Sequence, residues 1–419
     1  MFALVPAIQA GKVDLAGSLK SQSGSVFGAR GKLRIRSALV LIQVSLSFVL
    51  LVAAVLLIQS MQRIRNSNPG FLTQSLLTTP IDLVAAGYDA QRAKDFQERL
   101  IDRVQTIGGV ESAALARVRP FSYATYSDGL IAVDGYQPAP DEQPAAEYNQ
   151  VGPDYFRTMG IPILYGREFT NADNETAPLV AIVNQKMVAQ YWHGEHPVGK
   201  RIHLKGQWLR VVGVAKLAKY GSFAEAPKPF FYVPLRQDFS IRTSLNIRTS
   251  QDPAAIAADL ARVMHQLDSN LAPSEIITMR QHINRTALSS QQIAVALLSI
   301  FGGLALLLAA VGLYGVMSYS VSQSTRELGL RMALGARPTH LVRLVLSHGL
   351  VLTAAGVVLG AVAALLLTRL FATLLYQVSP RDPFAFGVAF MVMTTASFAA
   401  CFFPAWCATR TDPARALRD

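Results

Sequence analysis

Four long stretches of this chain contain no Asp, Glu, Lys or Arg, and they constrain its fold more than any other feature. A helix needs about 20 consecutive, mostly apolar residues to cross the hydrocarbon core of a bilayer, and each of the four stretches is that long. The sequence therefore predicts four transmembrane helices, one early in the chain and three late, at residues 37–62, 293–320, 344–367 and 384–406.

The segment between the first two predicted spans differs in charge balance from its flanks. Residues 62–292 contain 24 Lys and Arg against 22 Asp and Glu, whereas the whole chain of 419 residues carries a net charge of +12. The basic excess therefore lies beside the spans, as the positive-inside rule expects for cytoplasmic segments. We expect both termini in the cytoplasm and residues 63–285 on the outer side. Because this large segment has no basic bias, we expect no nucleic-acid partner.

Mixed secondary structure is predicted for the outer segment. We expect helices at residues 89–107, 185–191 and 253–267, and apolar residues recur with a helical period in the first of them. Short apolar runs between Pro and Gly predict further strands. These lie at residues 76–83, 110–118, 179–184, 245–248 and 276–279, with a hairpin from residues 198–202 and 209–214.

The order of these elements predicts one α/β subdomain, from residues 72–118 and 240–285, with a β-rich insertion at 119–239. We expect the second span to continue from a helix that starts near Gln281, which makes it longer than a bilayer requires. The expected fold class is an α+β membrane protein. One and then three transmembrane helices flank a large extracytoplasmic domain with α/β and β-rich parts.

A short charged segment, residues 325–337, separates the second span from the third and must lie at one face of the membrane. On a helix, Arg326 and Arg331 would flank an apolar side. Gly329 and Gly335 would each destabilise such a helix by about 1 kcal/mol relative to Ala. Small residues at these positions indicate that something packs closely against the backbone. An ordinary basic cytosolic loop is the alternative explanation.

The start of the chain is similar to its end. Residues 6–20 align without gaps with residues 404–418, and a short apolar stretch precedes each copy. The match indicates a membrane exit followed by a basic amphipathic tail, and an internal repeat of this kind suggests duplication. We therefore expect residues 1–36 to be a cytoplasmic tail and linker, the remnant of a preceding, similar repeat. Chance similarity between two membrane-exit patterns is the alternative.

Catalytic and metal-binding patterns are missing from the sequence. No G-x-x-x-x-G-K-[ST] phosphate loop occurs, so we expect no nucleotide site in this chain. His193, His196 and His203 lie close together, but their spacing matches no standard zinc pattern. Cys401 and Cys407 are expected to be free thiols that pack as small apolar residues. We predict no catalytic residue, no bound cofactor and no metal.

Glycines in the predicted spans favour close helix packing. Gly356 and Gly360 form a GxxxG pattern in the third span, which lets membrane helices approach one another. The pattern is common in apolar helices, so it is weak evidence by itself. The second span has small faces suited to the same kind of contact, at Gly302, Gly303, Gly312 and Gly315.

The segment at residues 325–337 resembles the R-E-[IL]-G-[IL]-R-x-A-[IL]-G-A signature of the MacB/FtsX-type ABC transporter permease family. The matching residues are Arg326, Glu327, Gly329, Arg331, Ala333, Gly335 and Ala336. The outer segment resembles the periplasmic core domain of MacB-type permeases at residues 154–160, 166–169, 183–184, 197–202 and 211–214. The resemblance covers nearly the whole chain. It departs at the N-terminus, where MacB itself carries an ATPase domain.

The resemblance implies a permease, or the second half of a duplicated permease, whose residues 286–419 form an FtsX-like permease domain. A separate ABC ATPase would bind ATP, contact residues 325–337 and drive movement of the outer domain, in export or other envelope transport. Such a permease is not an enzyme by itself. It would lie in the inner membrane with a second half or a second copy, and a periplasmic protein partner is compatible with it.

Two other functions remain open at this point. One is a membrane-anchored FtsX-like regulator, whose outer domain binds and activates an envelope enzyme. The other is an outer domain that is itself an enzyme, which would need a pocket lined by perturbed carboxylates or a metal cluster.

Overall fold

The computed structural model describes residues 26–122, 131–271, 275–323, 338–367 and 375–409. These parts form two compact units, one made of residues 64–290 and the other made of the segments before and after them. We call residues 64–290 the sheet domain and the other unit the helical unit. Each has apolar clusters of its own.

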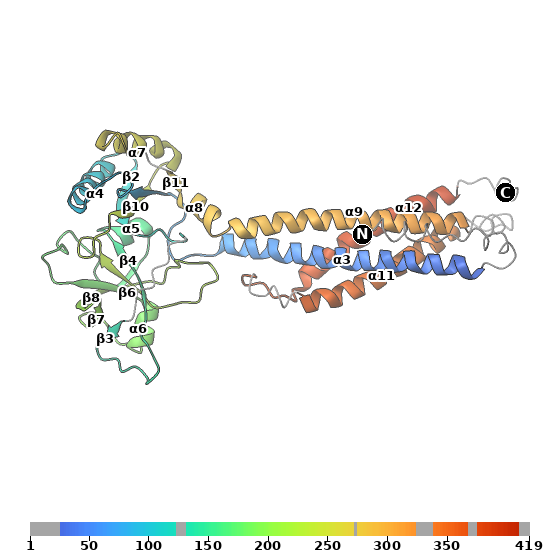
Figure 1. The fold of residues 1–419 in the computed structure, drawn as a ribbon, viewed down its shortest axis with the longest axis horizontal. Coiled ribbons are helices and arrows are strands. Elements are labelled where there is room, and N and C mark those ends of the chain that lie inside the picture. The colour runs from blue at the N-terminus through green and yellow to red at the C-terminus, as the bar shows by residue number, and fades with distance from the viewer. Residues whose placement is uncertain (1–25, 123–130, 272–274, 324–337, 368–374, 410–419) are drawn as a thin grey trace. The chain divides into compact units, whose positions relative to one another are not determined.

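Four long helices make up the described part of the helical unit, and Figure 1 shows them running along one another. They are α3 (Val26–Asn66), α9 (Ser289–Gln323), α11 (Pro338–Leu367) and α12 (Pro383–Thr409). Each contains a stretch of 22 or 32 residues that is long and apolar enough to cross a membrane. The four predicted spans are therefore confirmed.

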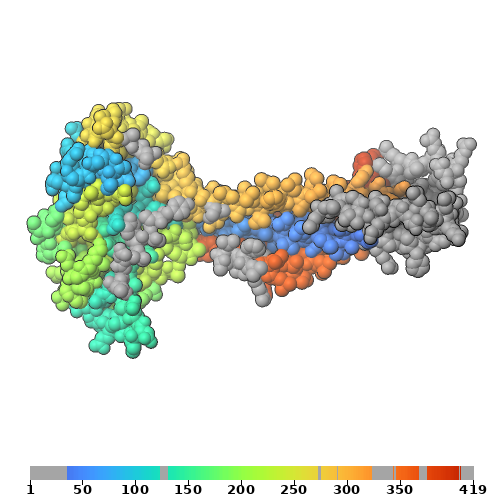
Figure 2. All heavy atoms as spheres, viewed as in Figure 1, coloured from blue at the N-terminus to red at the C-terminus, as the bar shows by residue number. Residues whose placement is uncertain are grey.

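The first of these helices, α3, is the most enclosed. A third of its apolar stretch is buried (33%), compared with 11% in α9. Val44, Phe48 and Val52 of α3 belong to one apolar cluster with Leu313 of α9 and Ala389 of α12. In Figure 2, α3 (blue) lies between α9 (gold) and α11 (orange) over part of its length. The first span is thus the packing centre of this unit.

A short break separates α8 (Met279–Thr286) from α9, so the predicted continuous helix from near Gln281 into the second span is wrong. Residues 287–288 form a turn, in which the backbone N–H groups of Ala287 and Leu288 both donate to the carbonyl oxygen of Ile283. The side chain of Leu288 is only 2% exposed. Burying this side chain favours the turn over continued helix.

One mixed sheet dominates the sheet domain. Its strands are β1 (Leu76–Asp82), β2 (Val110–Ala116), β3 (Ala132–Val133), β4 (Glu147–Val151), β5 (Ile163–Gly166), β6 (Val180–Asn184), β7 (Arg201–Leu204), β8 (Gln207–Ala215), β9 (Phe230–Pro234), β10 (Arg242–Thr249) and β11 (Ile277–Thr278). They follow the order β11-β1-β10-β2-β4-β9-β6-β8-β7-β3, and β5 pairs with β8. The chain leaves the first part of the sheet after β2 and returns to it at β10.

Two helices, α4 (Ala90–Gln105) and α7 (Pro253–Leu267), pack on the part of the sheet formed by β1, β10 and β2. They lie next to each other in Figures 1 and 2. Phe96 and Leu100 of α4 are fully buried in one cluster with Leu245 of β10 and Leu260 of α7. The side chain of Asp89 caps α4 by accepting from the N–H of Arg92. These helices and strands confirm the elements predicted for this part.

The other part of the sheet is built from β4, β9, β6, β8, β7 and β3, with the short helix α6 (Gln185–Tyr191). The short helix α5 (Tyr155–Met159) follows β4 in the chain but contacts β2 and β10. Strands β7 and β8 pair antiparallel, which confirms the predicted hairpin. Tyr148, Phe231 and Met187 are almost fully buried in its apolar cluster. Ala116 pairs with Val151 where β2 meets β4, and the N–H groups of Arg117 and Gly152 donate to the carbonyl oxygens of Gln150 and Leu115 on either side of this pair.

Candidate functional site

The segment that follows α3 is clamped to the sheet domain by its backbone. The carbonyl oxygen of Pro69 accepts a hydrogen bond from the N–H of Lys219 (2.9 Å), and the N–H of Leu72 donates to the carbonyl oxygen of Met159 (2.8 Å). Between them, Gly70 has φ +90°, and a Cβ atom there would lie 2.1 Å from the carbonyl oxygen of Leu217. Only glycine meets both conditions.

Aromatic side chains also hold the segment after α3 in place. Phe71 is 4% exposed, and its ring centroid lies 6.0 Å from that of Phe121. Phe121 in turn stacks on Phe223, with centroids 4.5 Å apart, and its N–H donates to the carbonyl oxygen of Tyr220 at 2.6 Å. Phe121 holds φ +60°, which is unusual for a residue with a side chain. The surrounding contacts hold this strained backbone in place.

Helix α8, which precedes α9 in the chain, contacts Pro120, the residue before Phe121. Nε2 of His282 lies 3.0 Å from the carbonyl oxygen of Pro120, and a carbonyl only accepts, so Nε2 carries the proton. The imidazole is 2% exposed. Burial, together with the positive charge of the neighbouring Arg119, lowers the pKa of His282 from 6.5 to about 4. The ring is therefore neutral at neutral pH.

Arg119 is the charged member of this group. Burial lowers its pKa, while the carboxylate of Glu275 acts in the opposite direction. Its Nη1 atom is buried and has no hydrogen-bond partner among the residues that the structure describes.

We call residues 69–72, 119–121 and 279–283 together the anchor. The chain segment after α3 and the helix before α9 both contact the loop at residues 119–121. The anchor offers packing and hydrogen bonds rather than an arrangement of nucleophile, base and acid.

Within the helical unit, the predicted glycines of the third span face α3. A Cβ atom at Gly356 would lie 2.5 Å from Cγ1 of Val44, and one at Gly360 would lie 2.8 Å from the carbonyl oxygen of Ser45. In the second span the glycines differ. Gly302 and Gly312 also face α3, whereas a Cβ atom at Gly303 or Gly315 would have no neighbour within 4 Å among the described residues.

The predicted ATPase-coupling residues lie outside the residues that the structure describes. They are Arg326, Glu327, Gly329, Arg331, Ala333, Gly335 and Ala336.

No group of three or more His, Cys, Asp or Glu residues with the geometry of a metal site occurs in the described ranges. Two of the three neighbouring histidines pack against different aromatic rings. The ring of His196 packs against Tyr165 with centroids 5.4 Å apart, and that of His203 packs against Trp208 at 5.1 Å.

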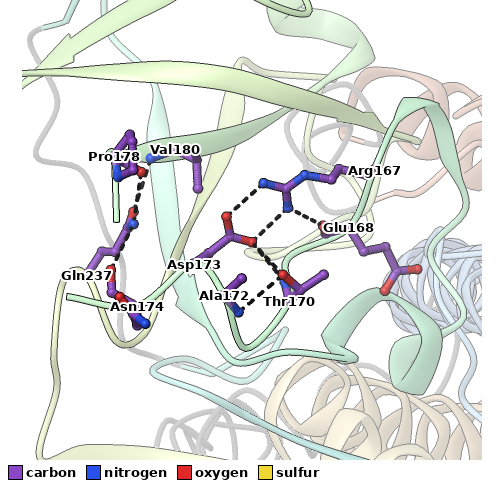
Figure 3. Close-up of polar contacts among 9 residues, drawn as sticks. All are labelled: Arg167, Glu168, Thr170, Ala172, Asp173, Asn174, Pro178, Val180 and Gln237. Carbon is purple, nitrogen blue, oxygen red and sulfur yellow. Dashed lines mark hydrogen bonds and ion pairs between the residues drawn. The ribbon is translucent and has the colours of Figure 1, made fainter. Parts of the chain in front are cut away.

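A tightly bonded loop leads into β6, as Figure 3 shows. Arg167 forms two hydrogen bonds with the carboxylate of Asp173, at 2.7 and 2.8 Å, and the N–H of Thr170 donates to the same carboxylate at 2.9 Å. The bond with Arg167 is the main reason that the pKa of Asp173 is lowered. Gln237 holds the next part of the loop through Pro178 and Val180. These contacts hold the loop in place. Burial and the nearby carboxylate of Asp154 raise the pKa of Glu168 in the same loop.

Sequence reasoning missed the anchor. Pro69-Gly70 indicates a turn, but nothing in the sequence shows that its partner lies at Leu217. His282 lies next to the predicted helix start near Gln281, and nothing in the sequence distinguishes it from other polar residues there. Its proximity to Pro120 depends on a contact between residues 162 positions apart.

Two family models match the chain. One, described as the MacB-like periplasmic core domain, matches residues 37–263, and the other, the FtsX-like permease C-terminal domain, matches residues 299–413. The macrolide export ATP-binding/permease protein MacB of Vibrio parahaemolyticus is 23% identical over 360 residues, which cover 82% of this chain and 53% of that protein. The uncharacterized ABC transporter permease YknZ of Bacillus subtilis is 25% identical over 231 residues (52% of this chain, 56% of that protein).

A third relative is the pyoverdine export ATP-binding/permease protein PvdT of Pseudomonas savastanoi pv. phaseolicola. It is 30% identical over 282 residues, which cover 61% of this chain and 40% of that protein. The chain spans about half the length of the curated relatives it matches. Among solved structures, the periplasmic region of MacB from Actinobacillus actinomycetemcomitans aligns with a TM-score of 0.36 and 15% identity, over 54% of this chain and 97% of that one.

Proposed function

Because the chain belongs to the family of MacB/FtsX-type ABC transporter permeases, we propose that it is a permease subunit whose sheet domain is moved by a separate cytoplasmic ATPase. The observation that carries this proposal is the order of the two family matches along the chain. A core domain is followed by a permease domain, and neither match contains a phosphate-binding loop. ATP would therefore be bound by the partner subunit and not by this chain.

We propose that the ATPase makes contact through residues 325–337. This segment lies between two spans and contains the seven residues of the family signature. On a helix, Glu327 and Arg331 lie one turn apart on the same face, where both charges can meet a partner surface. Gly329, Gly335 and Ala336 would let that partner approach the backbone closely.

The anchor supports the mechanical part of the proposal. Because residues 69–72 and α8 both contact the loop at residues 119–121, a displacement of either chain segment acts on the same point of the sheet domain. Buried, well-packed contacts transmit strain better than a mobile linker does. Such transmission would couple ATP hydrolysis to transport without a substrate path through this chain alone.

Partners and orientation complete the proposal. Four spans suggest a second permease, either another copy of this chain or a related half, beside the ATPase. The excess of Lys and Arg beside the spans supports an orientation with both termini on the cytoplasmic face of the inner membrane and the sheet domain on the other. The family names of the relatives suggest export as the direction of transport.

The proposal is tested by replacing the two charges of the coupling segment. Glu327→Ala combined with Arg331→Ala should lower the amount of ATPase that co-purifies with the tagged chain, and the purified chain alone should hydrolyse no ATP. Arg343→Ala is the control, since Arg343 is an exposed charge on α11 outside the segment. Unchanged co-purification in the double variant, or ATP hydrolysis by the chain alone, would contradict the proposal.

A further inference from the structure

A hollow of about 430 Å³ opens beside the segment that follows α3. Residues 68–72 form one wall, and residues 216–220 and 225–230 form most of the rest. Its volume lies within the roughly 300–1,000 Å³ of pockets that bind small molecules. The hollow belongs entirely to the sheet domain.

Three aromatic side chains give the hollow an apolar interior. Phe71, Tyr220 and Phe230 line it and are 4%, 8% and 4% exposed. The rings of Tyr220 and Phe230 stack with centroids 4.4 Å apart and an interplanar angle of 15°. Aromatic surfaces of this kind bind apolar groups of a ligand with little loss of conformational entropy.

Most of the charged residues that line the hollow are lysines, namely Lys216, Lys219 and Lys228. The single lining carboxylate, Glu225, already accepts hydrogen bonds from the N–H groups of Tyr220 (2.6 Å) and Gly221 (3.0 Å). It also lies 3.5 Å from Nζ of Lys228, which is paired more closely with Glu147 at 2.5 Å.

Lys216 differs from Lys228 because it is exposed and forms no ion pair with any residue that the structure describes. A basic side chain in this position keeps its charge available for a ligand. The lining therefore combines an apolar interior with an excess of positive charge at its edge.

We propose that the hollow binds a small anionic amphiphile, with its apolar body against Phe71, Tyr220 and Phe230 and its carboxylate paired with Lys216. A neutral apolar ligand would leave Lys216 without an ion-pair partner, and a cation would meet like charge. This inference goes beyond the proposed permease function and does not depend on an ATPase. Because the segment after α3 (residues 68–72) forms one wall, a ligand bound in the hollow would favour one position of that segment over others.

The test uses the full chain in nanodiscs of uncharged phosphatidylcholine, labelled with a photoreactive diazirine analogue of decanoate. Mass spectrometry should find the label at residues 68–72 and 216–230. Lys216→Gln should weaken labelling there by about two- to fivefold, as expected for loss of an ion pair made by an exposed side chain. Excess decanoate should compete, and decyltrimethylammonium should not.

Two further variants make the result decisive. Ala226→Trp places a large ring in the hollow and should abolish labelling at these residues while leaving every lysine in place. Arg103→Gln removes an exposed charge on α4, outside the lining, and should change nothing. Labelling confined to the membrane helices, equal competition by the cation, or labelling that survives both Lys216→Gln and Ala226→Trp would overturn the proposal.

Discussion

Gly360 on α11 lies against the backbone of Ser45 on α3, so closely that a Cβ atom would come within 2.8 Å of the Ser45 carbonyl oxygen. The same Cβ would lie 3.0 Å from Cβ of Phe48, and real Cβ atoms essentially never approach other heavy atoms more closely than that. One helical turn earlier, Gly356 faces Val44 in the same way. These two glycines set the closest approach of the first span to the third.

We predict that Gly360→Val destabilises the helical unit. The added methyl groups have no space against Ser45 and Phe48, and overpacking of this kind costs about 1–3 kcal/mol. Thermal unfolding in detergent should therefore begin at a lower temperature than in the unmodified protein. Gly387→Val on α12 is the matched control, since a Cβ atom there has no described neighbour within 4 Å. Equal losses in the two variants would show that the contact with α3 is unimportant.

Much of the helical unit could be predicted from the sequence because the signal is local. Runs of uncharged residues locate all four spans, and the spacing of Gly356 and Gly360 indicates a packing face. The partner of that face is not a local property, since Ser45 lies more than 300 positions away. The break between α8 and α9 was missed because it depends on burial of Leu288, and the residues around it are compatible with continuous helix.

In the sheet domain, too, local features could be predicted from the sequence and long-range strand pairings could not. The helices at residues 185–191 and 253–267 have the predicted bounds, because their caps lie in the adjacent sequence at Asn184 and at Asp252-Pro253. The order of the strands was not predictable in the same way. Parallel pairing of β4 with β9 joins segments about 80 positions apart, and no local signal indicates that β2 meets β4 at Ala116 and Val151.

A second prediction concerns Gly70, which lies against the backbone of Leu217. Gly70→Ala should weaken the clamp of the segment after α3, because its Cβ would lie 2.1 Å from the Leu217 carbonyl oxygen. Gly87→Ala is the control, because Gly87 also has a positive φ (+75°) but an unobstructed Cβ position.

Both variants carry the cost of positive φ, which is about 1 kcal/mol or more, and only Gly70→Ala carries the steric clash as well. Amide hydrogen exchange at residues 68–72 should therefore accelerate in Gly70→Ala, and exchange near Gly87 should report the smaller effect of backbone strain alone. If transport also falls in Gly70→Ala but not in Gly87→Ala, the anchor is required for coupling. Full transport with an accelerated exchange rate would exclude that role.

The neutral state of His282 predicts a pH dependence of stability. Its pKa is about 4 in the folded protein and near its ordinary 6.5 in the unfolded chain, so the unfolded chain binds more protons between these values. The contribution of His282 to stability should therefore be constant above about pH 7 and should fall as the pH drops from about 6.5 towards 4. The contribution of this one group between pH 7 and 4.5 is roughly 2–3 kcal/mol.

His282→Gln should remove that part of the slope, since the Gln amide does not titrate and its N–H₂ group is able to donate to Pro120. Pulse proteolysis in urea at pH 7 and pH 4.5 measures the difference in stability of the sheet domain. His265→Gln, at an exposed position on α7, should leave the slope as it is. A slope that persists in His282→Gln would assign the pH dependence to other groups.

Removing the carboxylate of Asp173, which pairs with Arg167 (Figure 3), should destabilise the protein more than removing the exposed carboxylate of Asp259. The Asp173 side chain is 5% exposed and accepts from Arg167 and from the N–H of Thr170. Asp173→Ala removes these hydrogen bonds, each of which contributes about 0.5–1.5 kcal/mol net. Asp259→Ala removes an exposed carboxylate from its pair with Arg262 and should cost at most about 1 kcal/mol. Because the pKa of Asp173 is lowered, its contribution is present above its ordinary pKa near 4 and is lost as the pH falls below it. Urea unfolding of both variants at pH 7 measures the two losses, and similar values would show that the loop before β6 is held by its other contacts.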